Sequence, residues 1–145
     1  MKWLIAWVVA AVSFGVLDAL WLRWAGPNLY RPALGELLAD KFRVVPAVLF
    51  YVVFITGMVW FAVRPGLING GVIDLLDSFG LAKGVPYAVL NGALFGGIAY
   101  ATYDLTNQAT LKTWPVEITL LDIAWGASAT ALAAGAAAFA VLKLA

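Results

Sequence analysis

Four stretches of this chain are long and apolar enough to cross a lipid bilayer. The first extends from Trp3 to Leu22 and carries Asp18 as its only charged residue. Twenty helical residues rise about 30 Å, the thickness of the hydrocarbon core. Further stretches cover residues 44–63, 86–105 and 116–142. The sequence therefore predicts an all-α polytopic membrane protein with four transmembrane helices.

The composition fits the same fold class. Hydrophobic residues make up 64% of the 145 and charged residues 12%, against about half and about a quarter in an ordinary soluble domain. A soluble domain of this size could not bury so much apolar surface, so the surplus must face lipid. We therefore expect a single transmembrane domain over residues 1–145, with the lipid bilayer as its partner. The formal net charge of +1 offers no basic patch for nucleic acid.

Two absent residue types restrict the chemistry. Without cysteine the chain has no disulfide, thiol nucleophile or cysteine-ligated metal. Without histidine it lacks the commonest general base and metal ligand, and with them histidine-ligated haem and the carboxylate–histidine di-iron centre. We therefore expect no metal site and no cofactor, and chemistry limited to carboxylates, tyrosines, amides and backbone groups.

Polar and turn-forming residues separate the apolar stretches. The first polar stretch, Arg23–Arg43, contains two prolines and predicts a connecting loop with a short surface helix near 32–42. Arg64-Pro65-Gly66 predicts the end of the second span. Residues 72–80 are too few to cross the bilayer and predict an interfacial helix, with a re-entrant segment as the alternative.

Four crossings place both termini on one side of the membrane. The positive-inside rule gives no orientation, because four Lys/Arg lie on the terminal side and five on the other. A cleaved signal peptide is the alternative for the first stretch, since Ala11-Val12-Ser13 resembles a cleavage site. The apolar run continues well beyond that site, to Leu22, which favours a span.

Chain direction brings acidic residues from three helices to the side that holds the first and third loops. The first helix ends there, with Asp18 about 6 Å below Leu22 by the helical rise. The third helix ends there with Asp104, and the fourth begins there, with Glu117 at the rim and Asp122 roughly 9–10 Å deep. Four carboxylates thus converge in one leaflet, and their cost in lipid requires them to face the bundle interior or water.

Helical spacing groups other polar and aromatic residues with these acids. Tyr100 and Asp104 stand four residues apart, and Asn107 lies on the next turn. The pattern Asp-x-x-Trp occurs in both the first and the fourth helix, which run in opposite directions. The candidate ligand- or proton-binding residues are Asp18, Tyr100, Tyr103, Asp104, Asn107, Glu117 and Asp122, with Trp21 and Trp125 as pocket aromatics.

Three arginines of the first loop, Arg23, Arg31 and Arg43, are the expected counter-ions of these acids. Three interpretations stay open for the charges. They form a salt-bridged cap that only locks the loop to the bundle, they line a functional polar cavity, or they are rim carboxylates hydrated among the headgroups.

Small residues predict where helices pack closely in lipid. Gly92 and Gly96 form such a surface on the third helix, and Gly126 and Thr130 form one on the fourth. We expect these two surfaces to meet within the chain. The alternative is that one of them forms a homodimer seam.

The segment from Tyr100 to Pro115 (YATYDLTNQATLKTWP) is distinctive, as are LDIAWG at 121–126 and LDALWL at 17–22. In these residues the chain resembles a family of small bacterial membrane proteins known as a domain of unknown function. The resemblance extends over most of the chain and implies a four-helix protein of the bacterial inner membrane. It implies no activity. Its motifs coincide with the polar residues selected above by helical spacing.

Two classes of function follow from these residues. A carboxylate-lined pocket predicts binding or transport of a small cation, a proton or a lipid headgroup. The alternative is a structural or accessory membrane protein whose polar cluster only stabilises the bundle. An enzyme is not expected, because no nucleophile elbow, phosphate loop or metal-ligand spacing is present. A lipid-acting enzyme without histidine would use Asp18, Asp104 or Asp122 as general base and Tyr103 as proton donor.

Overall fold

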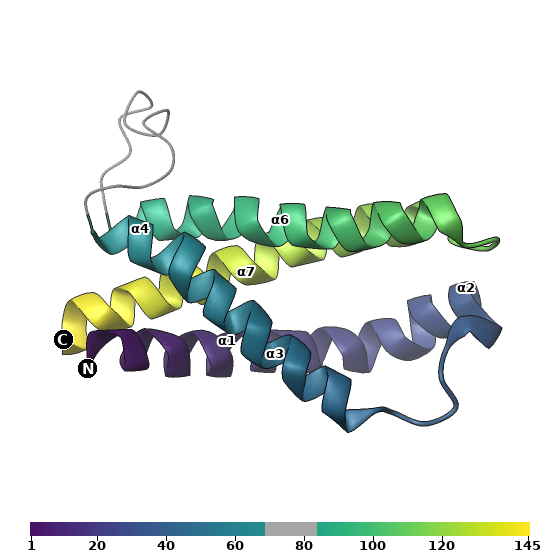
Figure 1. Ribbon diagram of the computed structural model, residues 1–145, viewed down its shortest axis with the longest axis horizontal. Coiled ribbons are helices and arrows are strands. Elements are labelled where there is room, and N and C mark those ends of the chain that lie inside the picture. Colours follow the sequence, from purple (N-terminus) through teal and green to yellow (C-terminus); the bar gives the residue numbers. More distant parts are fainter. Residues whose placement is uncertain (69–83) are drawn as a thin grey trace.

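The computed structural model describes residues 1–68 and 84–145, which form four long helical segments (Figure 1). In the first, α1 (Lys2–Ala25) continues through a π-helical turn, η1 (Gly26–Tyr30), into α2 (Arg31–Leu34) and η2 (Gly35–Leu37). In the second, α3 (Val44–Met58) continues through the π-helical turn η3 (Val59–Val63) into α4 (Arg64–Leu67). The third and fourth are α6 (Val85–Thr110) and α7 (Val116–Leu144). These residues contain no strand, so the all-helical prediction is confirmed.

Length and composition suit these helices to a membrane. The segments Lys2–Leu37, Val44–Leu67 and Val116–Leu144 are each long and apolar enough to cross one. The 26 residues of α6 rise about 39 Å, so this helix also has the length of a span. The structure thus has three to four helices able to span a bilayer. The interfacial helix expected at 72–80 lies outside the described residues.

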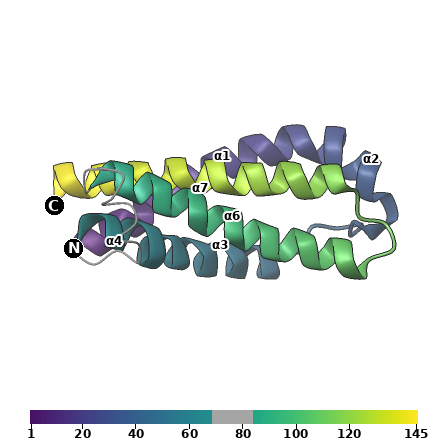
Figure 2. The same ribbon diagram turned by 90° about the horizontal axis from the view of Figure 1, so that it is seen from above.

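The two ends of the bundle differ in what they hold. The N and C termini lie together at one end, which we call the terminal end (Figures 1 and 2). The connections 38–43 and 111–115 lie at the opposite, loop end (Figure 1). As a result α1 and α7 run antiparallel, as do α6 and α7. The second segment crosses the others diagonally, and α3 diverges from α6 toward the loop end (Figure 1).

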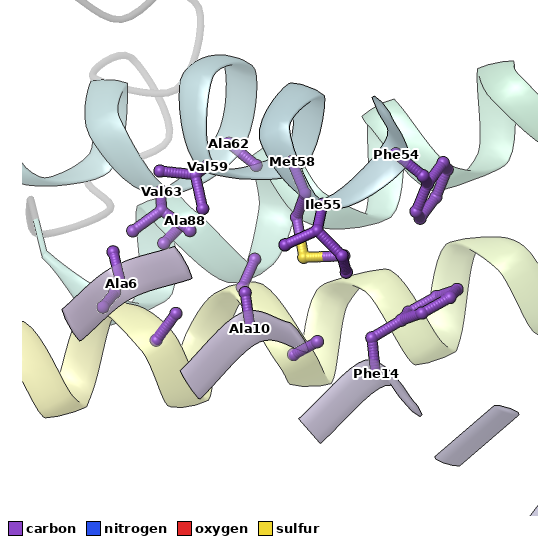
Figure 3. Packing of buried hydrophobic residues seen from close by; sticks show 14 of the residues in the cluster. Ala6, Ala10, Phe14, Phe54, Ile55, Met58, Val59, Ala62, Val63 and Ala88 are labelled. Carbon is purple, nitrogen blue, oxygen red and sulfur yellow. The ribbon is translucent and has the colours of Figure 1, made fainter. Parts of the chain in front are cut away.

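Side-chain size explains this divergence. On α1 the buried row begins with Ala6 and Ala10, whose small side chains let η3 approach closely at the terminal end (Figure 3). The next buried residue in the row is Phe14, and its ring packs against Phe54 with centroids 5.0 Å apart. Beyond this pair α3 leaves the core, and Val45 near its start is 70% exposed. The helices therefore pack closely at the terminal end, and α3 stands apart from the others at the loop end.

The closest helix contact is that between α6 and α7. A Cβ atom added at Gly96 would lie within 3 Å of the Gly126 carbonyl oxygen and the Thr130 side chain, and one added at Gly92 would meet Thr130 and Ala134. The expected meeting of these small-residue surfaces within one chain is thereby confirmed. Both surfaces are buried inside the bundle, and the alternative of a homodimer seam stays a prediction.

The loop predicted over Arg23–Arg43 is the main error in the predicted secondary structure. Helix continues to Leu37, and only residues 38–43 connect it to α3. A proline in a helix removes one hydrogen bond and its ring crowds the preceding turn. Here a π-helical turn precedes the proline, and the Arg31 N–H donates to the Gly26 carbonyl, five residues back. Pro32 follows at once, so the wider turn accommodates the ring without ending the helix.

The second segment repeats this solution. The Arg64 N–H donates to the Val59 carbonyl, again five residues back, and Pro65 follows. The helix therefore ends at Leu67, the residue directly after the stop predicted at Arg64-Pro65-Gly66. The third helix likewise continues past residue 105, to Thr110.

Candidate functional site

A cluster of buried polar side chains occupies the bundle between its middle and the loop end. Asp18, Asp104 and Asp122 are all buried, although they come from three different helices. Each lies on the inward face of its helix, so the lipid-facing surface carries none of these charges. The expectation that these acids point into the bundle is met at all three positions.

The Asp18 carboxylate is held by a tyrosine from α3. The Tyr51 hydroxyl donates to Asp18 Oδ2 at 2.5 Å. Such a hydrogen bond to a charged acceptor is stronger than one between neutral groups. It also links α1 to α3 at the level where α3 begins to leave the core.

A second tyrosine holds the Asp122 carboxylate. The Tyr30 hydroxyl, from the π-helical turn η1, donates to Asp122 Oδ1 at 2.5 Å. The same hydroxyl accepts a hydrogen bond from Trp21 Nε1 at 2.9 Å. The rings of Trp21 and Trp125 stack with centroids 4.6 Å apart and an interplanar angle of 8°. The two Asp-x-x-Trp motifs are therefore in contact through their tryptophan rings, between α1 and α7.

This stacking corrects the depths predicted for the acids. The two tryptophans lie at one level, and each Asp precedes its Trp by three residues on antiparallel helices. Asp122 is thus displaced toward the loop end and Asp18 toward the terminal end. The sequence predicted the reverse order, because it placed the end of the first helix at Leu22 instead of beyond residue 30.

Asp104 has the most unusual environment of the three. Its side chain is 0% exposed, and neither carboxylate oxygen has a hydrogen-bond donor of normal geometry among the described residues. Its polar neighbours are Asp122 and the Trp114 indole. Tyr100, one turn earlier on α6, lies within electrostatic range of all three acids. A buried carboxylate without a partner is tolerated only at a substantial free-energy cost or with a proton bound.

Two cavities adjoin the cluster and share part of their walls. The first, which we call the aromatic cavity, has a volume of about 560 Å³ and lies between α1, α3 and α6. Its lining includes Asp18, Tyr51 and Tyr100. The second, the arginine cavity, has a volume of about 660 Å³ and lies nearer the loop end. Leu22, Tyr30 and Tyr103 line both.

The remaining candidate residues lie outside this arrangement or at its edge. Tyr103 is 60% exposed and packs edge-on against the Trp114 ring while lining both cavities. Asn107 is half-buried and lines neither cavity. Glu117 is exposed and also lines neither. The structure therefore brings together Asp18, Trp21, Tyr100, Asp104, Asp122 and Trp125, but not Asn107 or Glu117.

The expected arginine counter-ions do not pair with the acids. Arg23 and Arg31 line the arginine cavity, and Arg43 lies in the connection before α3. Within residues 1–68 and 84–145 none of the three has a carboxylate oxygen within 4.0 Å. Tyrosine hydroxyls take their place on two of the acids, so a salt-bridged cap is not what holds this cluster.

Sequence reasoning missed the two tyrosine donors. Tyr51 stands one helical turn before Ile55 of the buried core, at the loop-end half of its span, which was a usable signal for a donor facing Asp18. Tyr30 gave no such signal, because it stood in a predicted loop. A third set was also missed: Trp114 Nε1 donates to Thr119 Oγ1 at 3.2 Å, and that hydroxyl donates to Gln108 Oε1 at 2.9 Å.

These features define an all-helical membrane protein with a polar, tyrosine-braced interior. The chain belongs to the family described as "Predicted membrane protein (DUF2177)", whose model matches residues 3–139. The matched range contains every residue of the cluster, and the family resemblance inferred from the sequence is confirmed. The family has no known function. No curated protein and no solved structure matches the chain.

Proposed function

We propose that the protein binds a lipophilic organic cation of the quaternary ammonium type in the aromatic cavity, with Asp18 as its counter-ion. The observation that carries this proposal is the lining of the cavity. Nine of its 13 lining residues are aromatic, and Asp18 is the one carboxylate among them. No Lys or Arg is among these described lining residues. Aromatic faces and a single negative charge are the chemistry that recognises organic ammonium groups.

The size and construction of the cavity support the same ligand class. A volume of about 560 Å³ falls within the range of small-molecule sites, about 300–1,000 Å³. Asp18 is fixed by Tyr51, so the carboxylate is held in place before a ligand arrives. A hard inorganic cation would instead need several oxygen ligands around it, and the aromatic walls do not offer them. Among the cation, proton and headgroup alternatives, an organic cation fits this lining best.

The proposal includes four crossings of the bilayer, with α6 as the fourth although it is not uniformly apolar. Its buried polar residues, Asn91 and Asp104, face the interior of the bundle. The glycine contacts bind α6 to α7, which is itself a candidate span. We propose the bacterial inner membrane as the location.

The test is titration of the purified protein with benzyltriethylammonium in neutral maltoside detergent, followed by calorimetry. We expect saturable binding to the wild type and binding at least about tenfold weaker to Asp18→Asn, because the ligand loses its counter-ion. Asp40→Asn is the matched control, since Asp40 is exposed in the connection and lines neither cavity. Benzyl alcohol is the uncharged control ligand.

The same experiment separates this function from a purely structural one. If the cluster only stabilises the bundle, Asp18→Asn lowers the unfolding temperature without any ligand effect. Absence of binding to the wild type, or equal affinity in Asp18→Asn and Asp40→Asn, would overturn the proposal.

A further inference from the structure

The arginine cavity carries a charge that the proposed function does not use. Its charged lining residues are Arg23, Arg31 and Asp122. Asp122 is already engaged by the Tyr30 hydroxyl at 2.5 Å. Neither arginine has a carboxylate partner within the described parts of the chain. The cavity therefore presents two free guanidinium groups and an excess of positive charge.

The π-helical turn is what places both arginines on one wall. In a regular α-helix, residues eight apart are turned by about 80° from each other. One α-helical turn of about 3.6 residues plus one π-helical turn of about 4.4 residues makes about eight, which is two full turns. Arg23 and Arg31 are eight apart and enclose the turn Gly26–Tyr30, so they fall on the same face. Their common presence in the cavity lining agrees with this register.

We propose that Arg23 and Arg31 form a binding site for a phosphate group, carried by a phospholipid headgroup or by a free phosphate ester. Guanidinium groups present paired N–H donors that match phosphate oxygens two at a time. Two of them on one wall engage different oxygens of the same phosphate. Apart from Asp122, the remaining polar side chains of the lining are Tyr30, Tyr103 and Trp114.

The rest of the wall is apolar, which suits a ligand that also carries hydrocarbon. Leu22, Leu34 and Leu38 line the cavity together with Pro27. Basic pockets between membrane helices are where anionic lipid headgroups bind. The site is distinct from the aromatic cavity in its charge and does not depend on Asp18.

The experiment uses the full chain in neutral maltoside micelles, titrated separately with dihexanoyl phosphatidylglycerol and with inorganic phosphate. Heats are measured against protein-free micelles. We expect Arg23→Gln and Arg31→Gln each to weaken binding by about tenfold, since each removes a charge-assisted pair. Arg43→Gln removes the same charge from the connection, lines neither cavity, and should bind as the wild type does. Thermal unfolding of each variant confirms that the fold is retained.

The two probes distinguish the source of the phosphate. Binding of the lipid alone assigns a phospholipid, and binding of both probes with the same dependence on the arginines assigns a phosphate ester from solution. Binding of neither, or an equal effect of all three arginine variants, overturns the site. Because the cation titration is independent, failure here leaves the function proposed for the aromatic cavity standing, and the reverse holds as well.

Discussion

Replacing Gly96 by alanine should destabilise the protein although alanine is the better helix former. A Cβ at this position would lie 2.1 Å from the Gly126 carbonyl oxygen and 2.6 Å from Thr130 Cβ. Real Cβ contacts essentially never fall below 3.0 Å, so α6 and α7 would have to separate by about 0.9 Å. The neighbouring Gly97 provides the matched control, because its Cβ would make an ordinary contact with Ala127 at 3.6 Å.

The magnitude follows from two opposing contributions. Exchange of glycine for alanine inside a helix favours the folded state by about 0.5–1 kcal/mol, and both variants receive this gain. Overpacking a tight contact costs about 1–3 kcal/mol or more, and only Gly96→Ala incurs it. A backbone oxygen cannot rotate away as a side chain can, so the upper part of that range applies. We expect the free energy of unfolding to fall by about 1–2 kcal/mol in Gly96→Ala and to rise by up to about 1 kcal/mol in Gly97→Ala.

The measurement is reversible unfolding in mixed detergent micelles, followed by the far-ultraviolet circular dichroism of the helices. The decisive quantity is the difference between the free energies of unfolding of the two variants, because the gain in helix propensity is the same in both and cancels. Equal stabilities of Gly96→Ala and Gly97→Ala would refute the close α6–α7 contact, and with it the placement of Asp104 against Asp122.

Two further substitutions test the polar cluster by the same unfolding measurement. Tyr30→Phe should lower the free energy of unfolding by about 1–3 kcal/mol, because it leaves Asp122 without its donor; Tyr103→Phe, which removes an exposed hydroxyl, should stay within about 0.5 kcal/mol of the wild type. Asp104→Asn should raise the free energy of unfolding by about 1 kcal/mol or more, because an amide costs less to bury than a carboxylate without a partner. A lower stability in Asp104→Asn than in the exposed control Asp40→Asn would mean that a donor not seen in the structure holds this carboxylate.

The features of the fold that the sequence predicts well depend on the composition of a whole segment and not on any single residue. Twenty apolar residues in a row identify a candidate span whatever the neighbours are, so the starts of the segments near residues 3, 44 and 116 are predicted closely, as are the ends of the last two. Glycine spacing similarly predicted the α6–α7 contact, since only small residues permit helices to approach so closely. Both signals are properties of one helix alone.

The missed extension of the first segment and its donor Tyr30 depend on a single local event in the backbone. Pro27 and Pro32 favour a loop by every rule based on regular helices. The π-helical turn Gly26–Tyr30, which contains Pro27 and precedes Pro32, keeps the helix intact and carries Tyr30 toward Asp122. A helical pattern that assumes 3.6 residues per turn everywhere does not allow for a wider π-helical turn. The sequence therefore could not predict that Tyr30 donates to Asp122, or that Arg23 and Arg31 lie on one face.

The misplaced acid, by contrast, was within reach of the sequence. Glu117 stands five residues before Asp122, which is a rotation of about 140° on a regular helix. The two carboxylates could not share the inward face of α7, and the structure leaves Glu117 exposed. The prediction for Glu117 rests on its depth along the membrane and takes no account of its angle around the helix.

The uneven packing of α3 leaves the start of this helix, which forms one wall of the aromatic cavity, outside the core. The helix has 15 residues and is held by the core near Met58, while its first turn is attached only through the connection 38–43. About 10 Å of helix separates Val44 from Tyr51, whose hydroxyl holds Asp18, so each degree of tilt beyond Tyr51 would displace Val44 by about 0.2 Å. We expect this wall to adjust only near the loop-end mouth of the cavity, so that ligands of different width fit while Asp18 and Tyr51 stay in place. The residues that stay fixed, near the contact between the Phe54 and Phe14 rings, would then set which ligands the cavity selects.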